Sequence, residues 1–343
     1  MTIRHRTAAA AAALPVTAAL LLAGCGGNGS PEPESQAQEP AAGAEADVDE
    51  GGEAGETVTI VDAQDREVEV PVEPEVIVAM DWGVIRTLSD LGVEVDGVPG
   101  MAGALPADLA GYAEGDVAQV GTVFEPDYEA IEAMNPDLVI VGSRSGTPEV
   151  VAEFENFAPA VVDLSVREES PDELFDLVEE RVLQLGEIVD RTDEAQQLMG
   201  DLRVEVEAVR TEAEASGETA MVVQVSDGTV AAYGPNSRFG TVFKDFGYAA
   251  TDAPVDGTGS HGEEVSQEFF VQYNPGVLFV LDRAKAIGEE QTPALDVLNN
   301  GLVGTTDAAA NDTIVELDGF SWYLAPAAPS SWQQMVDDVR ASL

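Results

Sequence analysis

The stretch Tyr128–Arg144 reads YEAIEAMNPDLVIVGSR, and the chain repeats its design 139 residues later. The second copy, Gln267–Arg283, reads QEFFVQYNPGVLFVLDR. Five of the 17 aligned positions are identical, namely Glu129/Glu268, Asn135/Asn274, Pro136/Pro275, Val141/Val280 and Arg144/Arg283. Each copy predicts a short amphipathic helix, an Asn-Pro turn, an apolar strand and an arginine just past the strand.

A shorter similarity precedes each copy. Leu88–Pro99 reads LSDLGVEVDGVP and resembles Phe243–Pro254, which reads FKDFGYAATDAP. Two similar units in the same order predict two similar lobes. Ligands of open α/β sheets bind beyond the carboxyl ends of the strands. Facing lobes would therefore place Arg144 and Arg283 on opposite walls of one cleft, as a clamp for an anion.

Residues 1–24 are expected to be a lipoprotein signal peptide. Arg4 and Arg6 give it a positive start, and Ala8–Leu22 is an apolar run too short for a stable membrane span. The run leads into Leu-Ala-Gly-Cys, which is similar to the bacterial lipobox and implies cleavage before Cys25 and a lipid such as palmitate on that residue. A secretory signal with an incidental cysteine is the alternative. Because Cys25 is the only cysteine, no intramolecular disulfide can form.

Residues 25–56 are expected to be a lipid-anchored, disordered acidic tether, because they contain nine acidic residues and no Lys or Arg. The whole chain has a net charge of −50, with lysine only at positions 244 and 285. Such a charge excludes nucleic acid as a partner. The acidic side chains repel one another at low salt and are screened at high salt. This behaviour favours a protein from a salt-loving source over an ordinary acidic protein.

The remaining residues, 57–343, are sufficient for two domains of ordinary size. Their patterns predict a β-hairpin at Thr57–Pro71 turning around Asp62–Arg66, a strand at Val76–Met80, a helix at Trp82–Leu91 ended by Gly92, and buried strands at Leu138–Val141 and Val277–Val280. Strands that alternate with helical segments predict parallel α/β lobes.

Two helical segments, Ser170–Val189 and Thr192–Ala215, lie between the lobes. The second has apolar residues at steps of three and four, and acidic residues in its first turn. A helix of about 24 residues spans about 36 Å and resists bending, so we expect small lobe movement on binding. The expected division is an N-terminal lobe at 57–190, a connecting helix at 191–215 and a C-terminal lobe at 216–343.

Five segments resemble, in order, the substrate-binding lipoproteins of ABC importers for iron–siderophore complexes and cobalamin. They are VTIVDAQDREVEVP, VGTVFEPDYEAIEAMNPDLVIVGSR, YGPNSRFG, TGSHGEE and NPGVLFVLDR. Within that family the chain is most similar to binders of ferric catecholates of the enterochelin and petrobactin type. The resemblance implies two Rossmann-like lobes joined by a long helix, the class III periplasmic-binding-protein architecture. It also implies a lipid-anchored monomer on the extracytoplasmic face of the membrane that delivers cargo to ABC permease and ATPase subunits.

Taken position by position, the resemblance also implies site residues. The ligand-binding set is Arg144, Arg238, Arg283 and Trp322, the iron ligands are His261 and Tyr323, and the permease-docking residues are Glu129 and Glu268. The glycine-rich stretch before His261 is longer than in relatives, which leaves the reach of that histidine open. The alternatives are surface ion pairs for the arginines, a solvent-facing loop position for His261, core packing for Tyr323 and exposed helix charges for the glutamates.

These residue types suit an anionic ferric catecholate. Arginine offers planar donors and stacks on aromatic rings. A tetradentate bis-catecholate leaves two of the six Fe(III) positions open, which one imidazole and one phenolate would fill. A hexadentate siderophore would need neither. In this interpretation Fe(III) is cargo, and the protein has no cofactor of its own.

Enzyme chemistry has little support in this sequence. The expected mature chain has one histidine, which leaves no Ser-His-Asp arrangement and no zinc site of histidines. No Gly-Lys-Ser/Thr phosphate loop is present. We therefore predict a binding protein and not an enzyme. The alternatives are the same fold with cobalamin or haem, a metal-dependent enzyme on a two-lobed α/β scaffold, and an adhesion or structural lipoprotein.

Overall fold

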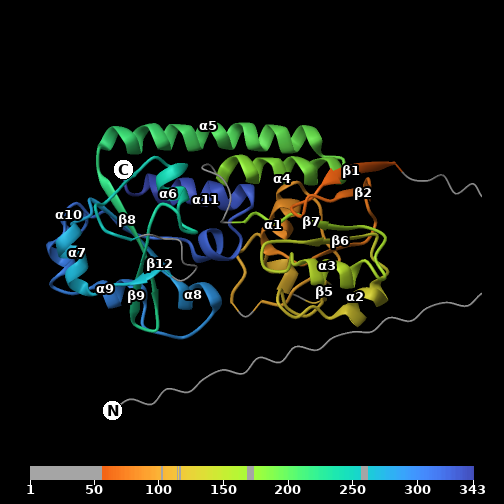
Figure 1. Cartoon of the computed structure of the whole chain (residues 1–343), viewed down its shortest axis with the longest axis horizontal. Helices are drawn as coiled ribbons and strands as arrows, with labels where there is room; N and C mark the ends of the chain where they lie inside the picture. The colour runs from red at the N-terminus through yellow and green to blue at the C-terminus, as the bar shows by residue number, and fades with distance from the viewer. Residues whose placement is uncertain (1–55, 102, 114, 116, 168–173, 256–261) are drawn as a thin grey trace, which may run out of the picture. The chain divides into compact units, whose positions relative to one another are not determined.

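The computed structural model describes residues 56–101, 103–113, 115, 117–167, 174–255 and 262–343 (Figure 1). The expected signal peptide, Cys25, nearly all of the tether and His261 lie outside the described residues.

The first element is a β-hairpin, as predicted. Strands β1 (Thr57–Val61) and β2 (Glu67–Pro71) pair antiparallel. The carboxylate of Asp62 holds the turn, because its Oδ1 accepts from the backbone N–H groups of Gln64 and Arg66 at 2.8 and 3.0 Å. Burial alone would raise the pKa of Asp62, but these bonds and the Arg66 guanidinium lower it below its usual value.

The first lobe is built on a five-stranded sheet in the order β5-β4-β3-β6-β7, with every neighbouring pair parallel. Its strands are β3 (Ile77–Ala79), β4 (Gly97–Val98), β5 (Ala118–Gln119), β6 (Leu138–Val141) and β7 (Val161–Asp163). Its helices are α1 (Trp82–Asp90), η1 (Ala110–Ala113), α2 (Tyr128–Met134) and α3 (Pro148–Phe154). Alternate residues of β6 enter separate apolar clusters, so both faces of the sheet are covered.

The second lobe is built on a six-stranded sheet in the order β11-β9-β8-β12-β13, with β10 beside β8. Its strands are β8 (Thr219–Ser226), β9 (Thr229–Tyr233), β10 (Ala249–Ala250), β11 (Glu263–Glu264), β12 (Val277–Asp282) and β13 (Ile314–Glu316). Strands β9 and β11 run antiparallel to their neighbours, so the prediction of a parallel second lobe is wrong for this edge. The cause is the tight Asp227-Gly228 turn, with φ of 50° and 73°, which folds β9 directly back on β8.

The remaining elements of the second lobe are short helices. They are α6 (Thr241–Lys244), α7 (Gln267–Tyr273), α8 (Arg283–Ile287), α9 (Ala294–Leu298), η2 (Val303–Thr305), α10 (Asp307–Ala310) and the π-helix η3 (Phe320–Leu324). The chain then forms α11 (Pro329–Arg340).

The internal repeat is a structural repeat. Helices α2 and α7 have seven residues each and end at Asn135 and Asn274, whose φ angles of 50° and 36° are left-handed. Asparagine tolerates this conformation better than other non-glycine residues, and the proline that follows cannot extend the helix. In the preceding similarity, Gly92 and Gly247 also share a positive φ, at 75° and 77°.

The lobes are joined by α4 (Leu174–Ile188) and α5 (Thr192–Ser216). Helix α5 has 25 residues and ends at Gly217 with φ 68°, close to the predicted bounds. It packs on α4 and on α11, as Figure 1 shows. Helix α11 also packs on α1 of the first lobe, where Asp90 accepts from the Ser330 N–H at 2.9 Å. Within the described ranges, no helix is both long and apolar enough to cross a bilayer.

Candidate ligand-binding site

Arg144 follows β6 in a loop that leaves little freedom. The Ser143 hydroxyl donates to the Val166 carbonyl at 2.8 Å and accepts from the Val166 N–H at 3.1 Å. The buried Ser145 hydroxyl donates to the Met80 carbonyl at 2.9 Å. At Gly146, a Cβ would lie 2.4 Å from the Ser165 hydroxyl oxygen. These contacts fix the backbone on both sides of Arg144.

Arg283 occupies the equivalent position after β12. The carboxylate of Asp282 caps α8, with Oδ1 accepting from the Lys285 N–H at 2.9 Å and Oδ2 accepting from the Ala294 N–H at 2.8 Å. This cap makes Arg283 the first residue of α8. The capping carboxylate is buried, so the position of Arg283 is determined by the core of the second lobe.

Arg238 comes from a third segment, the turn after β9. The Ser237 hydroxyl donates to the Gly234 carbonyl at 2.7 Å and closes this turn. The next residue, Phe239, is buried, and its ring lies edge-on to Tyr233 with a centroid distance of 4.8 Å. Arg238 is therefore held between a closed turn and an aromatic pair.

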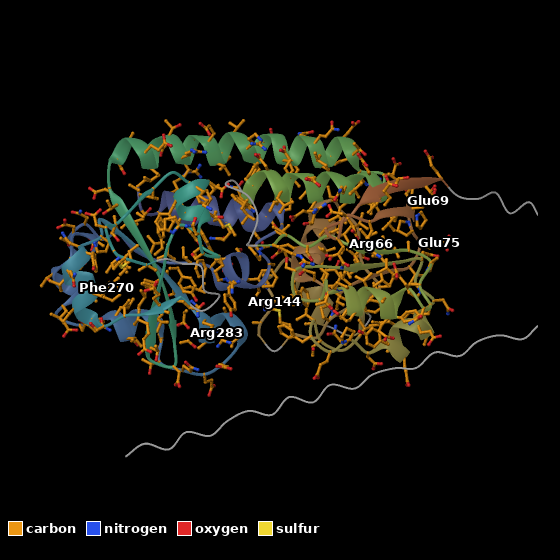
Figure 2. All side chains as sticks on the ribbon, in the orientation of Figure 1. Arg66, Glu69, Glu75, Arg144, Phe270 and Arg283 are labelled. Atoms are coloured by element: carbon orange, nitrogen blue, oxygen red, sulfur yellow. The ribbon has the colours of Figure 1, made fainter. Side chains whose placement is uncertain are left out.

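Tyr323 is the point at which the three arginines meet. Its carbonyl accepts from Arg144 at 2.8 Å and from Arg238 at 3.3 Å, and its hydroxyl accepts from Nε of Arg283 at 3.2 Å. The Arg238 and Arg144 guanidinium carbons lie 4.2 and 5.2 Å from its ring centroid. Figure 2 marks Arg144 and Arg283 on their separate elements. The structure thus brings together four of the predicted site residues.

The cluster concentrates positive charge in a protein whose net charge is −50. All three arginines are half-buried, so solvent screens them less than surface charges. No carboxylate in the described part of the chain lies within ion-pairing distance of Arg283. Desolvation raises the pKa of Asp81, which packs against Gly142 behind the Arg144 loop, while its hydrogen bonds and the Arg144 charge oppose that rise. The cluster has the chemistry of an anion site.

Trp322 does not join the arginines. It is 3 % exposed, its ring lies 6.1 Å from that of Phe246, and its indole N–H donates to Asp338 Oδ2 at 2.8 Å. The indole therefore faces the core. Direct ligand contact by Trp322 stays a prediction, and its burial argues against it.

The structure describes only one of the two predicted iron ligands. Tyr323 is in the cluster, whereas His261 lies outside the described residues. Among the residues that the structure describes, no group of three or more His, Cys, Asp or Glu side chains could hold a metal ion.

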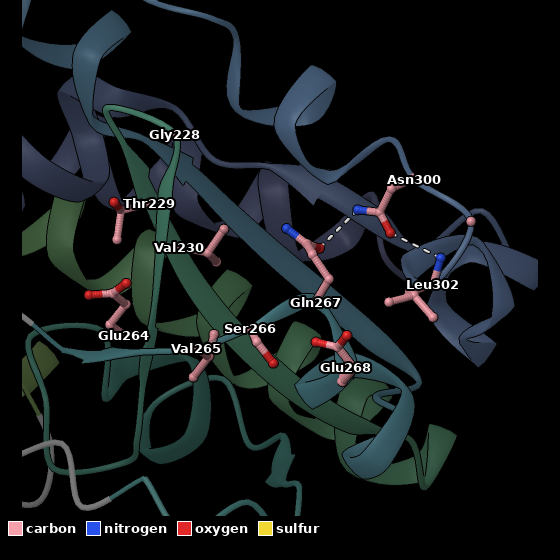
Figure 3. Close-up of a pocket in the computed structure, with 11 residues that line it drawn as sticks. Gly228, Thr229, Val230, Glu264, Val265, Ser266, Gln267, Glu268, Asn300 and Leu302 are labelled. Carbon is pink, nitrogen blue, oxygen red and sulfur yellow. Dashed lines mark hydrogen bonds between the residues drawn. The ribbon is translucent and has the colours of Figure 1, made fainter.

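Glu129 and Glu268 are exposed and are the second residues of α2 and α7. The pKa of Glu268 is lowered by its own backbone N–H and by the Ser266 hydroxyl. Beside Glu268 lies a surface groove of about 690 Å³ (Figure 3). The groove is lined by Gly228, Thr229, Val230, Glu264, Val265, Ser266, Gln267, Glu268, Asn300, Gly301 and Leu302. Docking through the two glutamates remains a prediction.

Sequence reasoning missed two polar groups that bear on the site. The Ser226 hydroxyl accepts from Arg283 at 3.5 Å, and it ends β8, the strand that pairs with β12. The rule that ligands bind at the carboxyl ends of parallel strands could have identified it. The second group is Asp338, which holds the indole of Trp322, and a chain with 65 acidic residues gave no signal to distinguish it.

The chain has well-matched relatives. The family described as periplasmic binding protein matches residues 77–319. The petrobactin-binding protein YclQ of Bacillus subtilis is 31% identical over 291 residues, which cover 84% of this chain and 89% of that protein. The YclQ crystal structure has a TM-score of 0.76 at 30% identity, covering 84% of this chain and 98% of that one.

A second solved structure, the catecholate-siderophore binding protein VctP of Vibrio cholerae, has a TM-score of 0.77 at 28% identity. The match covers 84% of this chain and all of VctP. These relatives are binding proteins and not enzymes, in agreement with the prediction. The match over 77–319 and the likeness to YclQ confirm the predicted two-lobed architecture, and this chain belongs to the periplasmic binding protein family.

Proposed function

We propose that this protein captures a ferric siderophore of the catecholate type and delivers it to an ABC permease. The observation that carries the proposal is the convergence of Arg144, Arg238 and Arg283 on Tyr323. The relatives YclQ and VctP, named for petrobactin and for catecholate siderophores, support the same ligand class.

The chemistry of the cluster fits an anionic ligand with aromatic rings. Guanidinium groups donate to catecholate oxygens and stack on catechol faces, while the metal stays inside its chelate. The Tyr323 carbonyl and hydroxyl now accept from these donors, and ligand oxygens would compete for them. For a tetradentate siderophore, the Tyr323 phenolate and His261 would complete the Fe(III) shell.

The proposal extends to where and how the protein works. Lipid on Cys25 would anchor it to the extracytoplasmic face of the membrane through the acidic tether. Glu129 and Glu268, exposed at equivalent positions of the two lobes, would dock on paired basic pockets of the permease. The groove beside Glu268 gives a basic permease side chain room on the second lobe.

The test is a titration of the purified protein, followed by intrinsic tryptophan fluorescence. The panel is a ferric bis-catecholamide, a ferric tris-catecholate, a ferric hydroxamate and vitamin B12. We expect binding of the catecholates and about a hundredfold loss in Arg144→Ala, since a charge-assisted hydrogen bond contributes about 1.5–3 kcal/mol. Arg340→Ala, which removes an exposed arginine paired with Glu205 and Asp337, is the matched control and should bind normally.

Two outcomes would overturn the proposal. Tight binding of vitamin B12 in place of the catecholates would assign a cobalamin carrier, which has little use for three arginines. Equal binding by wild type and Arg144→Ala would remove the arginine cluster from the ligand site.

A further inference from the structure

Asp338 of α11 accepts hydrogen bonds from three donors in separate places. Its Oδ2 accepts from the Asp318 N–H at 2.9 Å and from the Trp322 indole N–H at 2.8 Å. Its Oδ1 accepts from the Gln334 amide at 2.8 Å, one turn earlier on α11. The carboxylate therefore has a fixed orientation, on a helix whose Trp332, Met335 and Val336 are buried.

The segment that Asp338 holds is the π-helix η3, which contains Tyr323. Its wide turn is closed by the Ala325 N–H, which donates to the Phe320 carbonyl at 2.8 Å. Turns of this kind are rare, occur mostly as single turns and are frequent at functional sites. The Asp338 carboxylate, which lies on another helix, accepts from the Asp318 N–H just before η3 and from the Trp322 indole N–H within η3. That external support stabilises an otherwise uncommon backbone.

The support reaches the arginine cluster through one peptide bond. Tyr323 follows Trp322 directly, so movement of the indole displaces the backbone that carries the Tyr323 carbonyl. The bonds from Arg144 and Arg238 to that carbonyl are 2.8 and 3.3 Å long, and a shift of about 1 Å would break the longer one and weaken the other.

Helix α8 also packs closely against η3. At Gly319, just before η3, a Cβ would lie 2.6 Å from the Cβ of Ala286 and 3.0 Å from its Cα. Ala286 belongs to α8, the helix that begins with Arg283. The segment with Tyr323 thus contacts both α8 and Asp338 of α11.

We propose that Asp338 is a positioning residue for ligand binding, which fixes Tyr323 among the three arginines by holding Trp322 and Asp318. The inference rests on the proposed function, because it assigns Asp338 a role in the same site. Asp337, its neighbour in sequence, is exposed and pairs with Arg340 instead. Of these two adjacent carboxylates on α11, only Asp338 contacts the segment that carries Tyr323.

The test compares three variants by titration with a ferric bis-catecholamide, at a temperature where circular dichroism shows each to be folded. Asp338→Ala removes the acceptor and should weaken binding about tenfold or more, because it leaves the indole N–H unpaired. Asp338→Asn should bind within about threefold of wild type, since its single carbonyl oxygen can accept from both Asp318 and Trp322. Asp337→Ala should bind as wild type does.

A merely structural role would give a different result. It would lower the Tm of Asp338→Ala while leaving the Kd of the folded protein unchanged, and that result would overturn the inference. If Asp338→Ala does not fold, Trp322→Phe removes the same hydrogen bond and keeps an aromatic ring in the core. Unchanged affinity in a folded Trp322→Phe variant would contradict the inference equally.

A double-mutant cycle adds an independent readout. Positioning of Tyr323 acts through the arginines, so Asp338→Ala should cost less affinity in an Arg144→Ala background than in the wild type. Additive losses would count against the role. The two proposals fail separately: a wild type that does not bind the probe refutes the function, whereas equal binding by wild type and Asp338→Ala refutes only the positioning role.

Discussion

The guanidinium of Arg144, in the loop that follows strand β6 of the first lobe, donates to the main-chain carbonyl of Tyr323, 179 residues later in the chain. The bond joins the two lobes at the point where Arg238 and Arg283 also meet Tyr323. A change at Arg144 therefore tests whether the arrangement of donors, and not their charge alone, determines ligand affinity.

Arg144→Lys keeps the positive charge and removes the planar fork. We expect it to weaken binding of a ferric bis-catecholamide about tenfold, between the wild type and Arg144→Ala, because lysine can neither stack nor donate two parallel bonds. Fluorescence titration measures the effect, with Arg340→Lys as the control on a surface arginine. Wild-type affinity in Arg144→Lys would mean that charge alone suffices.

Tyr323→Phe removes the hydroxyl that accepts from Arg283 and retains the ring against Arg238. If the phenolate coordinates iron, the charge-transfer band of a bound ferric bis-catecholamide should shift on binding to the wild type and lose that shift in Tyr323→Phe. His261→Ala should have the same effect. An identical band shift in wild type and both variants would rule out direct coordination by these two residues.

Gly146→Ala should damage the Arg144 loop. The new Cβ would lie 2.4 Å from the Ser165 hydroxyl oxygen and 2.5 Å from Asp163 Oδ1, so we expect a loss of about 2–3 kcal/mol in the free energy of unfolding. Ligand affinity should fall as well. Gly200→Ala, on an exposed face of α5 with no atom near its Cβ, should instead add about 0.5–1 kcal/mol. Urea denaturation measures both, and equal effects would contradict the steric argument.

The paired asparagines should respond differently to glycine. Both have a positive φ, so alanine at either position should cost about 1–2 kcal/mol. Asn274→Gly should lose stability as well, because Asn274 donates to Asp307 at 2.7 Å and accepts from its backbone N–H at 2.9 Å. Asn135→Gly should be nearly neutral, since its bond to the Ala133 carbonyl is weak at 3.3 Å. Denaturation midpoints that fell equally for both would refute the distinction.

Stability should rise as the pH falls from neutral into the mildly acidic range. Desolvation raises the pKa of Asp90 and Asp338 above 3.8, so the folded state takes up protons before the unfolded state does. Their unfavourable contribution is present at neutral pH and is relieved as the pH falls through the raised values. Asp62, with a lowered pKa, stabilises the fold above 3.8, and this contribution is lost on stronger acidification.

The measurement is Tm by circular dichroism between neutral pH and about pH 4. Asp338→Asn removes one of the groups with a raised pKa, so its profile of Tm against pH should be flatter than that of the wild type. A Tm that falls steadily from neutral pH downward would contradict the assignment.

Much of the fold could be predicted from the internal repeat and from local sequence patterns. Strand β6 and helix α5 were predicted to within a residue or so, because continuous apolar runs and a sustained helical period are local signals. The antiparallel edge formed by β9 and β11 was not predicted, since sheet neighbours are determined by non-local pairing. The Asp227-Gly228 turn was the available signal and was not used.

The candidate site likewise contains residues that local sequence patterns predicted and residues that only the three-dimensional structure reveals. Each repeat presents its arginine after an apolar strand, so the convergence of Arg144 and Arg283 followed from strand order. Which of Trp322 and Tyr323 faces the arginines could not be derived, because the two are adjacent on a π-helix whose period differs from the α-helical one. The sequence offered no feature that distinguishes Asp338 from the other acidic residues, of which the chain has 65 in all. Only the hydrogen bonds that Asp338 accepts in the structure identify it.

Helix α11 packs on α1, and there its serines meet the first lobe: the Ser331 hydroxyl accepts from the buried Arg86 at 3.0 Å, and the Ser330 N–H donates to Asp90. The first lobe thus completes its interior with Pro329–Arg340, the last helix of the described chain. Because α11 also packs on η3 and β13 of the second lobe, both lobes depend on its docking for part of their contacts. A truncation that removes this helix should leave both lobes open to proteolysis, including the one that precedes it by more than a hundred residues.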